Sequence, residues 1–196
     1  MIESEDFLML KYYETERLLL RILNKEAAPL VLSFYIDNAE QFEPWEPKRS
    51  TNFYTLSYHK TLLTAEYNQI ADGKLIRYWV FRKDHPEEII GSICFQNLLR
   101  EPYCSCSLGY KFSRRHQHLG YATESINKSI EVLYGEYGLH RIDAFIMPEN
   151  ISSVKLIERL GFVYEGTSRS YARINGQWAD HLHYALINHN ETGRYQ

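Results

Sequence analysis

The sequence predicts a mixed α/β fold with a mostly antiparallel central sheet of about seven strands, flanked by helices and containing one βαβ unit. Three observations predict it. The spacing of apolar residues switches repeatedly between the helical and the strand period along the chain. Short connections join several successive strands, which favours antiparallel neighbours. Late in the chain a helical segment separates two strands, as a parallel crossover requires.

Size and composition are those of one soluble domain. The chain has 196 residues, 44% apolar and 14% aromatic, which is enough for one sizeable core. No repeat, low-complexity run or linker divides it, so we expect a single domain over residues 1–196. Residues 1–11 hold three acids and only a short apolar stretch, which predicts neither a signal peptide nor a spanning helix. We therefore expect a cytoplasmic protein without a membrane segment.

The first half of the chain predicts a strand over residues 16–23 and a helix over 25–36, in which Pro29 is tolerable only in the first turn. The proline-punctuated segment 42–47 predicts a rigid loop. A second helix is expected over 52–71, ended by Asp72-Gly73. Its apolar stripe would be formed by Leu56, Leu63, Tyr67 and Ile70.

The second half predicts three successive strands over 75–83, 88–98 and 104–112, then a helix over 119–134 and a strand over 141–147. Asn150 stands at an N-cap position before a short helix, for which Gly161 fits the C′ site. The remaining strands are expected at 162–165, 170–174 and 178–187. The last two are joined by Asn175-Gly176, a type I′ hairpin signal.

The junction between strand 104–112 and the next helix is the most informative segment. It carries the pattern Gln117-x-x-Gly120-x-Ala122. Backbone N–H groups at a helix start are unpaired and carry the positive end of the helix dipole, so they can hold a pyrophosphate. Small residues at 120 and 122 let the phosphates approach the backbone. By itself this pattern also fits an ordinary strand-to-helix turn with a close-packed glycine.

A second constellation favours the phosphate-binding interpretation. Downstream, the Asn150-led helix ends in Leu160-Gly161-Phe162. With both features the chain resembles the GNAT acetyltransferases, and along nearly its whole length the Rim-type ribosomal-protein-alanine N-acetyltransferases. The resemblance is carried by Glu16-Arg17-Leu18, Pro44-Trp45-Glu46-Pro47, Ile89-Ile90-Gly91, Phe95-x-Asn97, Leu108-Gly109-Tyr110, Arg159-Leu160-Gly161-Phe162, Glu165-Gly166 and Gly176-Gln177-Trp178-x-Asp180-His181.

The resemblance implies the GNAT fold and acetyl-CoA as co-substrate. It implies that backbone groups of the strand at Tyr110, Lys111 and Phe112 pair with the pantetheine arm, and that Asn150 contacts the cofactor. The implied pyrophosphate turn comprises Gln117, His118, Leu119, Gly120, Tyr121 and Ala122. Family members usually carry Gly where this chain has His118. We expect binding to survive because His118 still offers its backbone N–H.

Acetyl transfer needs a neutral amine, donors for the developing oxyanion and a proton for the departing thiolate. Many relatives protonate the thiolate with a Tyr seven residues after the motif Asn, where this chain has Ile157. Some Rim-type enzymes use a Ser three residues after that Asn, which implies Ser153. The alternative is that Ser153 simply completes the helix cap.

Two acids are candidates for binding or deprotonating the amine. Glu46 lies in the Pro-Trp-Glu-Pro segment, where the alternative is a solvated loop acid, and Asp180 follows the Asn-Gly hairpin, where the alternative is a structural hydrogen bond. A Glu that some relatives place before this hairpin is Ala172 here. An α-amine, with a pKa of about 7.7 to 8, tolerates a weak base, whereas a lysine at about 10.4 would need stronger help.

Charge and residue types bear on the alternative functions and partners. The formal net charge of −3 provides no basic field, so direct nucleic-acid binding is not expected. Cys94, Cys104 and Cys106 predict small buried thiols, and His116 with His118 lacks a third ligand nearby, so no metal is expected. The acceptor is the N-terminal alanine of a ribosomal protein or, alternatively, a small amine; a non-catalytic acetyl-CoA-binding module is the third possibility. The sequence leaves monomer and homodimer open.

Overall fold

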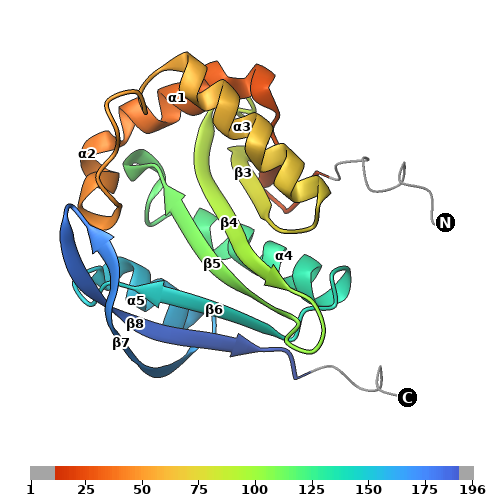
Figure 1. The fold of residues 1–196 in the computed structure, drawn as a ribbon. Coiled ribbons are helices and arrows are strands. Elements are labelled where there is room, and N and C mark those ends of the chain that lie inside the picture. The colour runs from red at the N-terminus through yellow and green to blue at the C-terminus, as the bar shows by residue number, and fades with distance from the viewer. Residues whose placement is uncertain (1–11, 190–196) are drawn as a thin grey trace.

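Residues 12–189 are described by the computed structural model. Within them lies an eight-stranded sheet in the order β1-β2-β3-β4-β5-β6-β8-β7 (Figure 1). The parallel pair is β5 and β6, and every other neighbouring pair is antiparallel. The strands are β1 (Tyr13–Glu14), β2 (Leu18–Arg21), β3 (Ile76–Arg82), β4 (Ile89–Leu99), β5 (Ser105–Phe112), β6 (Arg141–Ile146), β7 (Val163–Ile174) and β8 (Gln177–Ile187).

The predicted mixed fold with one βαβ unit is therefore confirmed, with eight strands in place of about seven. The two-residue strand β1 is too short to produce an apolar period. The segment 1–11, for which we expected neither a signal peptide nor a spanning helix, lies outside the described residues.

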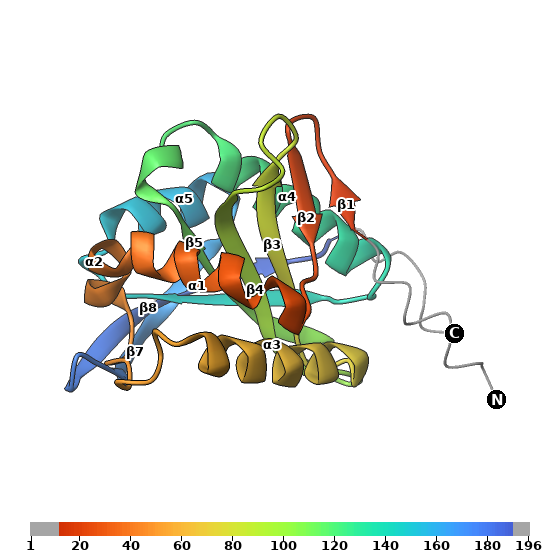
Figure 2. The same ribbon diagram turned by 90° about the horizontal axis from the view of Figure 1, so that it is seen from above.

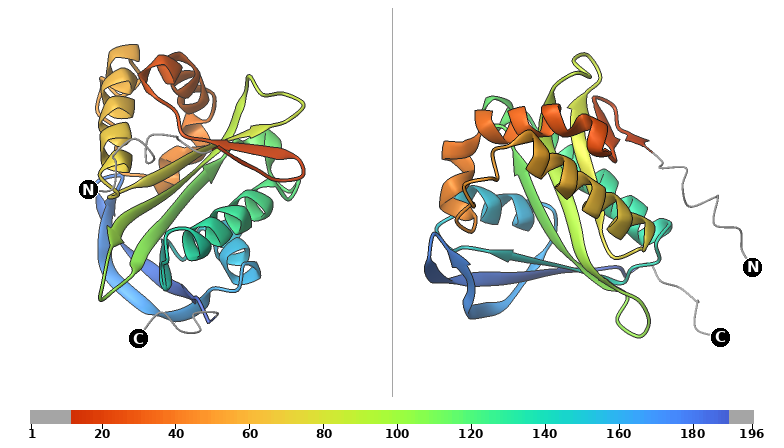
Figure 3. Two further views of the ribbon diagram at one scale, coloured as in Figure 1. Left: turned by 90° about the vertical axis from the view of Figure 1, so that its right-hand side faces the viewer. Right: turned by 45° about the horizontal axis from the view of Figure 1, so that its top comes forward.

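Helices cover both faces of the sheet. They are α1 (Ala28–Asp37), α2 (Ala39–Phe42), α3 (Leu56–Ala71), α4 (Tyr121–Gly135) and α5 (Ile151–Arg159). Figure 3 shows α1 and α3 on one face and α4 and α5 on the other, and Figure 2 shows α1 and α3 running across β3 and β4. Among residues 12–189, no helix combines the length and the apolar character that crossing a bilayer requires.

The core has two main parts, separated by the sheet. Strand β3 serves both, because its side chains alternate between the faces. Tyr78 and Val80 pack in the cluster beneath α4 and α5, while Trp79 and Phe81 pack in the cluster beneath α1 and α3. All four are at most 2% exposed, so β3 is buried on both sides.

The helix predictions hold with two corrections. Pro29 lies in the first turn of α1, as required. The buried stripe of α3 includes neither Leu56, which is 39% exposed, nor Tyr67, which is only partly buried. Because Thr55 caps the helix and Leu56 is its first residue, the buried stripe runs instead through His59, Leu63, Glu66 and Ile70. The segment predicted as a loop at 42–47 contains the end of α2 and a 3₁₀ turn, Glu43–Trp45, in which Pro44 occupies a starting position that needs no N–H donor.

The last hairpin is longer than predicted. Residues 162–165 and 170–174 were expected as separate strands, but β7 is continuous, and irregularities at Tyr164/Gly166 and Ser168/Ala172 accommodate the break in pattern. The hairpin signal is confirmed: Asn175 and Gly176 have φ of 46° and 83°, the two positive values that a type I′ turn needs.

Candidate active site

A cleft opens where β5 and β6 separate. Their pairing ends at Leu108 and Ala144, although β5 continues to Phe112 and β6 to Ile146. Figure 1 shows the two strands diverging toward α2 and α5. The cavity there has a volume of about 760 Å³, within the range typical of small-molecule sites. The divergence leaves backbone groups of β5 without a β6 partner beyond residue 108.

The turn entering α4 forms one wall of this cleft. Gly120 is the N-cap with φ of 81° and has no side chain to bond the first amides of the helix, and His118 has φ of 61°. Gln117, His118, Gly120, Tyr121 and Ala122 line the cleft as expected. Leu119 does not; its side chain is 50% exposed and its carbonyl accepts a hydrogen bond from Arg17 Nη1 at 3.1 Å. The amides of this turn therefore remain available to an anion.

The glycine that the resemblance leads one to expect at position 118 has a physical explanation. A left-handed backbone costs little for glycine and disfavours a residue with a Cβ. His118 adopts that conformation and keeps its N–H in the turn, while its side chain is exposed.

Asn150 and Ser153 lie on the opposite wall, at the start of α5. The predicted N-cap is confirmed, since Asn150 Oδ1 accepts hydrogen bonds from Ser153 N at 3.2 Å and from Ser152 Oγ at 3.0 Å. Tyr110 donates its hydroxyl to the Ser153 carbonyl at 3.2 Å, and burial raises the pKa of Tyr110 to about 12. Ile157, at the position of the usual tyrosine, is fully buried in the core. Lys155 and Arg159 also line the cleft from α5, although the sequence predicted no role for them in the site.

Glu46 lies in the cleft but is bound to two cations. Its carboxylate contacts Lys111 Nζ on one oxygen and Arg49 Nη2 on the other. Burial alone would raise the pKa of Glu46, but the charges and hydrogen bonds of Lys111 and Arg49 outweigh burial and lower it. A carboxylate held in its charged form by two partners is a poor proton acceptor.

The neighbours Asp180 and His181 have different positions: Asp180 bonds within the hairpin, and His181 faces the cleft. Asp180 is exposed and outside the cleft, and its Oδ1 accepts a hydrogen bond from Ser170 N at 2.7 Å, which is the structural bond weighed for it from the sequence. His181 is 7% exposed and lines the cleft. Its Nδ1 lies 3.1 Å from the Ala179 carbonyl oxygen, so Nδ1 carries the hydrogen and a neutral ring has its lone pair on Nε2.

The signal for His181 was present in the sequence. It stands next to Asp180 in the hairpin motif, but strand alternation alone does not fix which of two neighbours faces the cleft.

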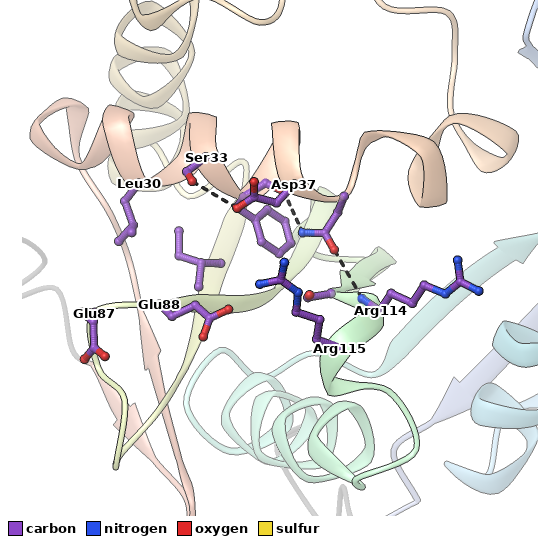
Figure 4. Close-up of a pocket in the computed structure, with 11 residues that line it drawn as sticks. Leu30, Ser33, Asp37, Glu87, Glu88, Arg114 and Arg115 are labelled. Carbon is purple, nitrogen blue, oxygen red and sulfur yellow. Dashed lines mark hydrogen bonds between the residues drawn. The ribbon is translucent and has the colours of Figure 1, made fainter.

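A second cavity of about 410 Å³ lies between α1, the start of β4 and the 3₁₀ turn Arg114–His116. Figure 4 shows Arg114 and Arg115 at this cavity together with Asp37, Glu87 and Glu88. Neither of these two arginines lines the larger cleft. Asn38 fixes their loop, since its Oδ1 accepts from Arg114 N at 3.3 Å.

Three potential metal ligands meet at one place among residues 12–189, on β6, β7 and β8. Asp143, Glu165 and His183 lie close enough to share a cation. Arg141 already binds both carboxylates, with Nη2 2.6 Å from Asp143 Oδ1 and Nη1 3.1 Å from Glu165 Oε1. The guanidinium therefore supplies the positive charge. Two of the three cysteines are buried thiols, as predicted: burial raises the pKa of Cys94, and that of Cys106 to about 12. Cys104 is only partly buried.

Strands that diverge at mid-sheet, beside an amide-lined turn at a helix start, form a cleft that suits a ligand with a diphosphate group. Residues 17–163 match the family model of the acetyltransferase (GNAT) domain. The chain is 33% identical to the [ribosomal protein uS5]-alanine N-acetyltransferase of Escherichia coli K12 over 88% of each chain. The chain therefore belongs to the GNAT acetyltransferase family, whose members are N-acetyltransferases that use acetyl-CoA.

Solved structures agree with this assignment. The ribosomal-protein-S5-alanine acetyltransferase of Vibrio fischeri superposes with a TM-score of 0.87 at 30% identity, covering 93% of this chain and 100% of that one. Mycobacterium smegmatis RimJ in complex with CoA-disulfide superposes with a TM-score of 0.81 at 22% identity, covering 87% and 81%, which is a likeness of fold.

Proposed function

We propose that this chain transfers the acetyl group of acetyl-CoA to the N-terminal α-amine of a ribosomal protein, with alanine as the favoured first residue, through a ternary complex in the cytoplasm. The observation that carries the proposal is the 33% identity, over 88% of both chains, with the uS5-alanine N-acetyltransferase. The likeness to the Vibrio fischeri enzyme over its whole chain adds support.

The residues of the cleft fit the acetyl donor. The open amides at 118–122 would hold the diphosphate, since Gly120 leaves room that a side chain would restrict. Backbone groups at Tyr110, Lys111 and Phe112 would pair with pantetheine, although the Phe112 carbonyl already accepts from Gln41 Nε2 at 2.9 Å. Asn150 would contact the donor from α5. The bound thioester supplies an activated acetyl group, and β5 backbone N–H groups would stabilise the charge on its carbonyl oxygen.

The acceptor would bind beside the wall formed by the 3₁₀ turn Glu43–Trp45 and the β7–β8 hairpin. Asn175 at the hairpin tip donates to the Glu43 carbonyl at 3.0 Å, which fixes this wall. Phe145, which lines the cleft, stacks on Tyr171 with ring centroids 4.4 Å apart. A rigid aromatic wall suits an extended peptide end.

His181 is the residue we propose as general base, in place of Glu46 and Asp180. Glu46 is paired with Lys111 and Arg49, and Asp180 is bonded outside the cleft. The amine nitrogen would form its bond to the acetyl carbon while the carbon–sulfur bond breaks. The Nε2 lone pair of His181 would take the proton that this nitrogen loses and later release it to solvent. Ser153, beside Tyr110, is the proposed donor of a proton to the departing thiolate, and it recovers its proton from solvent.

Mass spectrometry of peptides tests the function. Full-length protein is incubated with acetyl-CoA and a peptide that begins with alanine and contains an internal lysine. The control is the same peptide with a formylated N-terminus. The proposal predicts one acetyl group on the free peptide, located on the α-amine, and none on the control. Acetylation of lysine in both peptides, or turnover confined to small amines such as polyamines, would reject the proposed acceptor.

A further inference from the structure

One side chain from outside the cleft holds the phosphate turn in place. Arg17 lies between β1 and β2, and its Nε donates to Glu124 Oε2 at 2.7 Å while Nη2 approaches the same oxygen at 2.6 Å. Glu124 belongs to the first turn of α4. The backbone N–H of Arg17 adds a bond to Glu124 Oε1 at 3.0 Å, and the Thr15 hydroxyl adds another at 2.5 Å.

The same guanidinium contacts the turn itself. Arg17 Nη1 donates to the Leu119 carbonyl at 3.1 Å, and its Cζ lies 4.6 Å from the centre of the Tyr121 ring. A Cβ on Gly120 would come within 3.3 Å of Arg17 Nη2. Arg17 therefore contacts Leu119 and Tyr121 and lies beside Gly120 between them, in the segment that would offer its amides to the diphosphate.

The turn needs such support for two reasons. Both His118 and Gly120 have left-handed backbones, and for His118 this conformation is disfavoured locally. In addition, Glu124 puts a carboxylate in the helix turn where an anionic ligand must bind, and like charges there would repel. Burial alone would raise the pKa of Glu124, but hydrogen bonds from Thr15 and Arg17 and the Arg17 charge lower it, so it stays ionised and needs a partner.

We propose that Arg17 is a positioning residue for the acetyl donor, one that holds the 117–122 turn in its diphosphate-binding shape and neutralises Glu124 beside the bound anion. The inference rests on the proposed use of acetyl-CoA. It assigns a role to a residue about one hundred positions away from the turn in sequence, which pairs with α4 only in the folded chain.

Comparison of two acetyl donors tests the proposal. Acetyl-CoA carries the diphosphate, and S-acetylpantetheine lacks it. For Arg17→Ala we expect the KM for acetyl-CoA and the Kd for CoA to rise by about ten-fold or more, as loss of a charge-assisted contact does. The KM for S-acetylpantetheine and the kcat at saturation stay within about two-fold of wild type. Arg17→Lys keeps the positive charge but loses the planar guanidinium, so its KM for acetyl-CoA should lie between those of wild type and Arg17→Ala.

A double variant separates charge from geometry. In Arg17→Ala with Glu124→Gln the carboxylate no longer repels the diphosphate, so part of the lost CoA affinity returns. The matched control is Lys83→Ala, which removes a neighbouring surface ion pair, Lys83 Nζ to Glu14 Oε2 at 2.9 Å, away from the turn. It should leave both KM values unchanged.

Two results would overturn the proposal: Arg17→Ala indistinguishable from Lys83→Ala with both donors, or an equal rise in KM for both donors. Should circular dichroism show that Arg17→Ala does not fold, Arg17→Lys is tested with the same two donors. A higher KM for acetyl-CoA but not for S-acetylpantetheine supports the proposal, and unchanged KM values overturn it. Wild-type protein that binds no CoA would instead reject the proposed function, so the two failures are distinguishable.

Discussion

The Oδ1 atom of Asp180 lies 2.7 Å from the backbone nitrogen of Ser170, directly across the β7–β8 hairpin. Ser170 has φ of 47°, so this bond holds a strained residue within the irregular stretch of β7. The adjacent His181 lines the cleft instead. Neighbouring residues thus serve the hairpin and the site separately, and their substitutions should have different effects.

Replacing His181 should slow the reaction without unfolding the protein. For His181→Ala we expect kcat/KM for the peptide to fall by about one hundred-fold at neutral pH, because a general base commonly contributes that much. The loss of kcat/KM should shrink at alkaline pH, because hydroxide can then take the proton from the attacking amine in place of His181. A pH–rate profile of both proteins measures this. A deficit that is constant across pH would contradict the assignment as base.

Replacing Asp180 should destabilise the hairpin more than it slows chemistry. Asp180→Ala removes the acceptor for Ser170 N, which costs about 1 kcal/mol of stability. Asp180→Asn keeps an acceptor oxygen and should retain most of that stability. Urea unfolding gives the free energies, and kcat should remain within a few-fold of wild type. A loss of kcat in Asp180→Asn as large as in His181→Ala would return the catalytic role to the aspartate.

Glu46 is expected to support the fold in a pH-dependent way. Glu46→Gln leaves Lys111 and Arg49 partly buried without their counter-charge, which should cost about 3 kcal/mol at pH 7. Since the folded-state pKa of Glu46 lies below its ordinary value of 4.5, the stabilisation is present above that pH and is lost as pH falls through the folded-state pKa. Urea unfolding of wild type and Glu46→Gln, repeated from pH 7 downward, should show that the difference in their free energies of unfolding shrinks in acid. A difference independent of pH would exclude the ion pairs as its cause.

His118 is expected to be replaceable by glycine at no cost to cofactor binding. His118→Gly relieves the left-handed strain, which should stabilise the protein by up to about 1 kcal/mol, and it keeps the backbone N–H in the turn. Calorimetry should find CoA affinity unchanged or higher. Gly120→Ala is the opposite case, because a Cβ at φ of 81° is strained and approaches Arg17, so CoA affinity should fall. Weaker binding by His118→Gly would point to a role for the imidazole itself.

Features encoded by local periodicity and turn chemistry could be predicted from the sequence. Apolar segments separated by proline-containing turns predicted β3, β4 and β5, and the Asn-Gly pair predicted the hairpin turn. Asn150 was predicted as an N-cap because its short side chain, placed just before a helical apolar period, can accept a hydrogen bond from a first-turn amide. These predictions succeeded because each depends on contacts between residues a few positions apart.

The sequence by itself therefore determined the fold class, the position of the turn that enters α4, and the family. The tertiary structure decided what the charged residues do, because their partners are remote in the chain. Glu46 meets Lys111 across 65 positions, and Arg17 meets Glu124 across 107. Periodicity specifies that neighbouring strand residues face opposite sides, but irregular pairing in β7 shifts which side is which, so only the folded hairpin turns His181 toward the cleft and Asp180 toward Ser170.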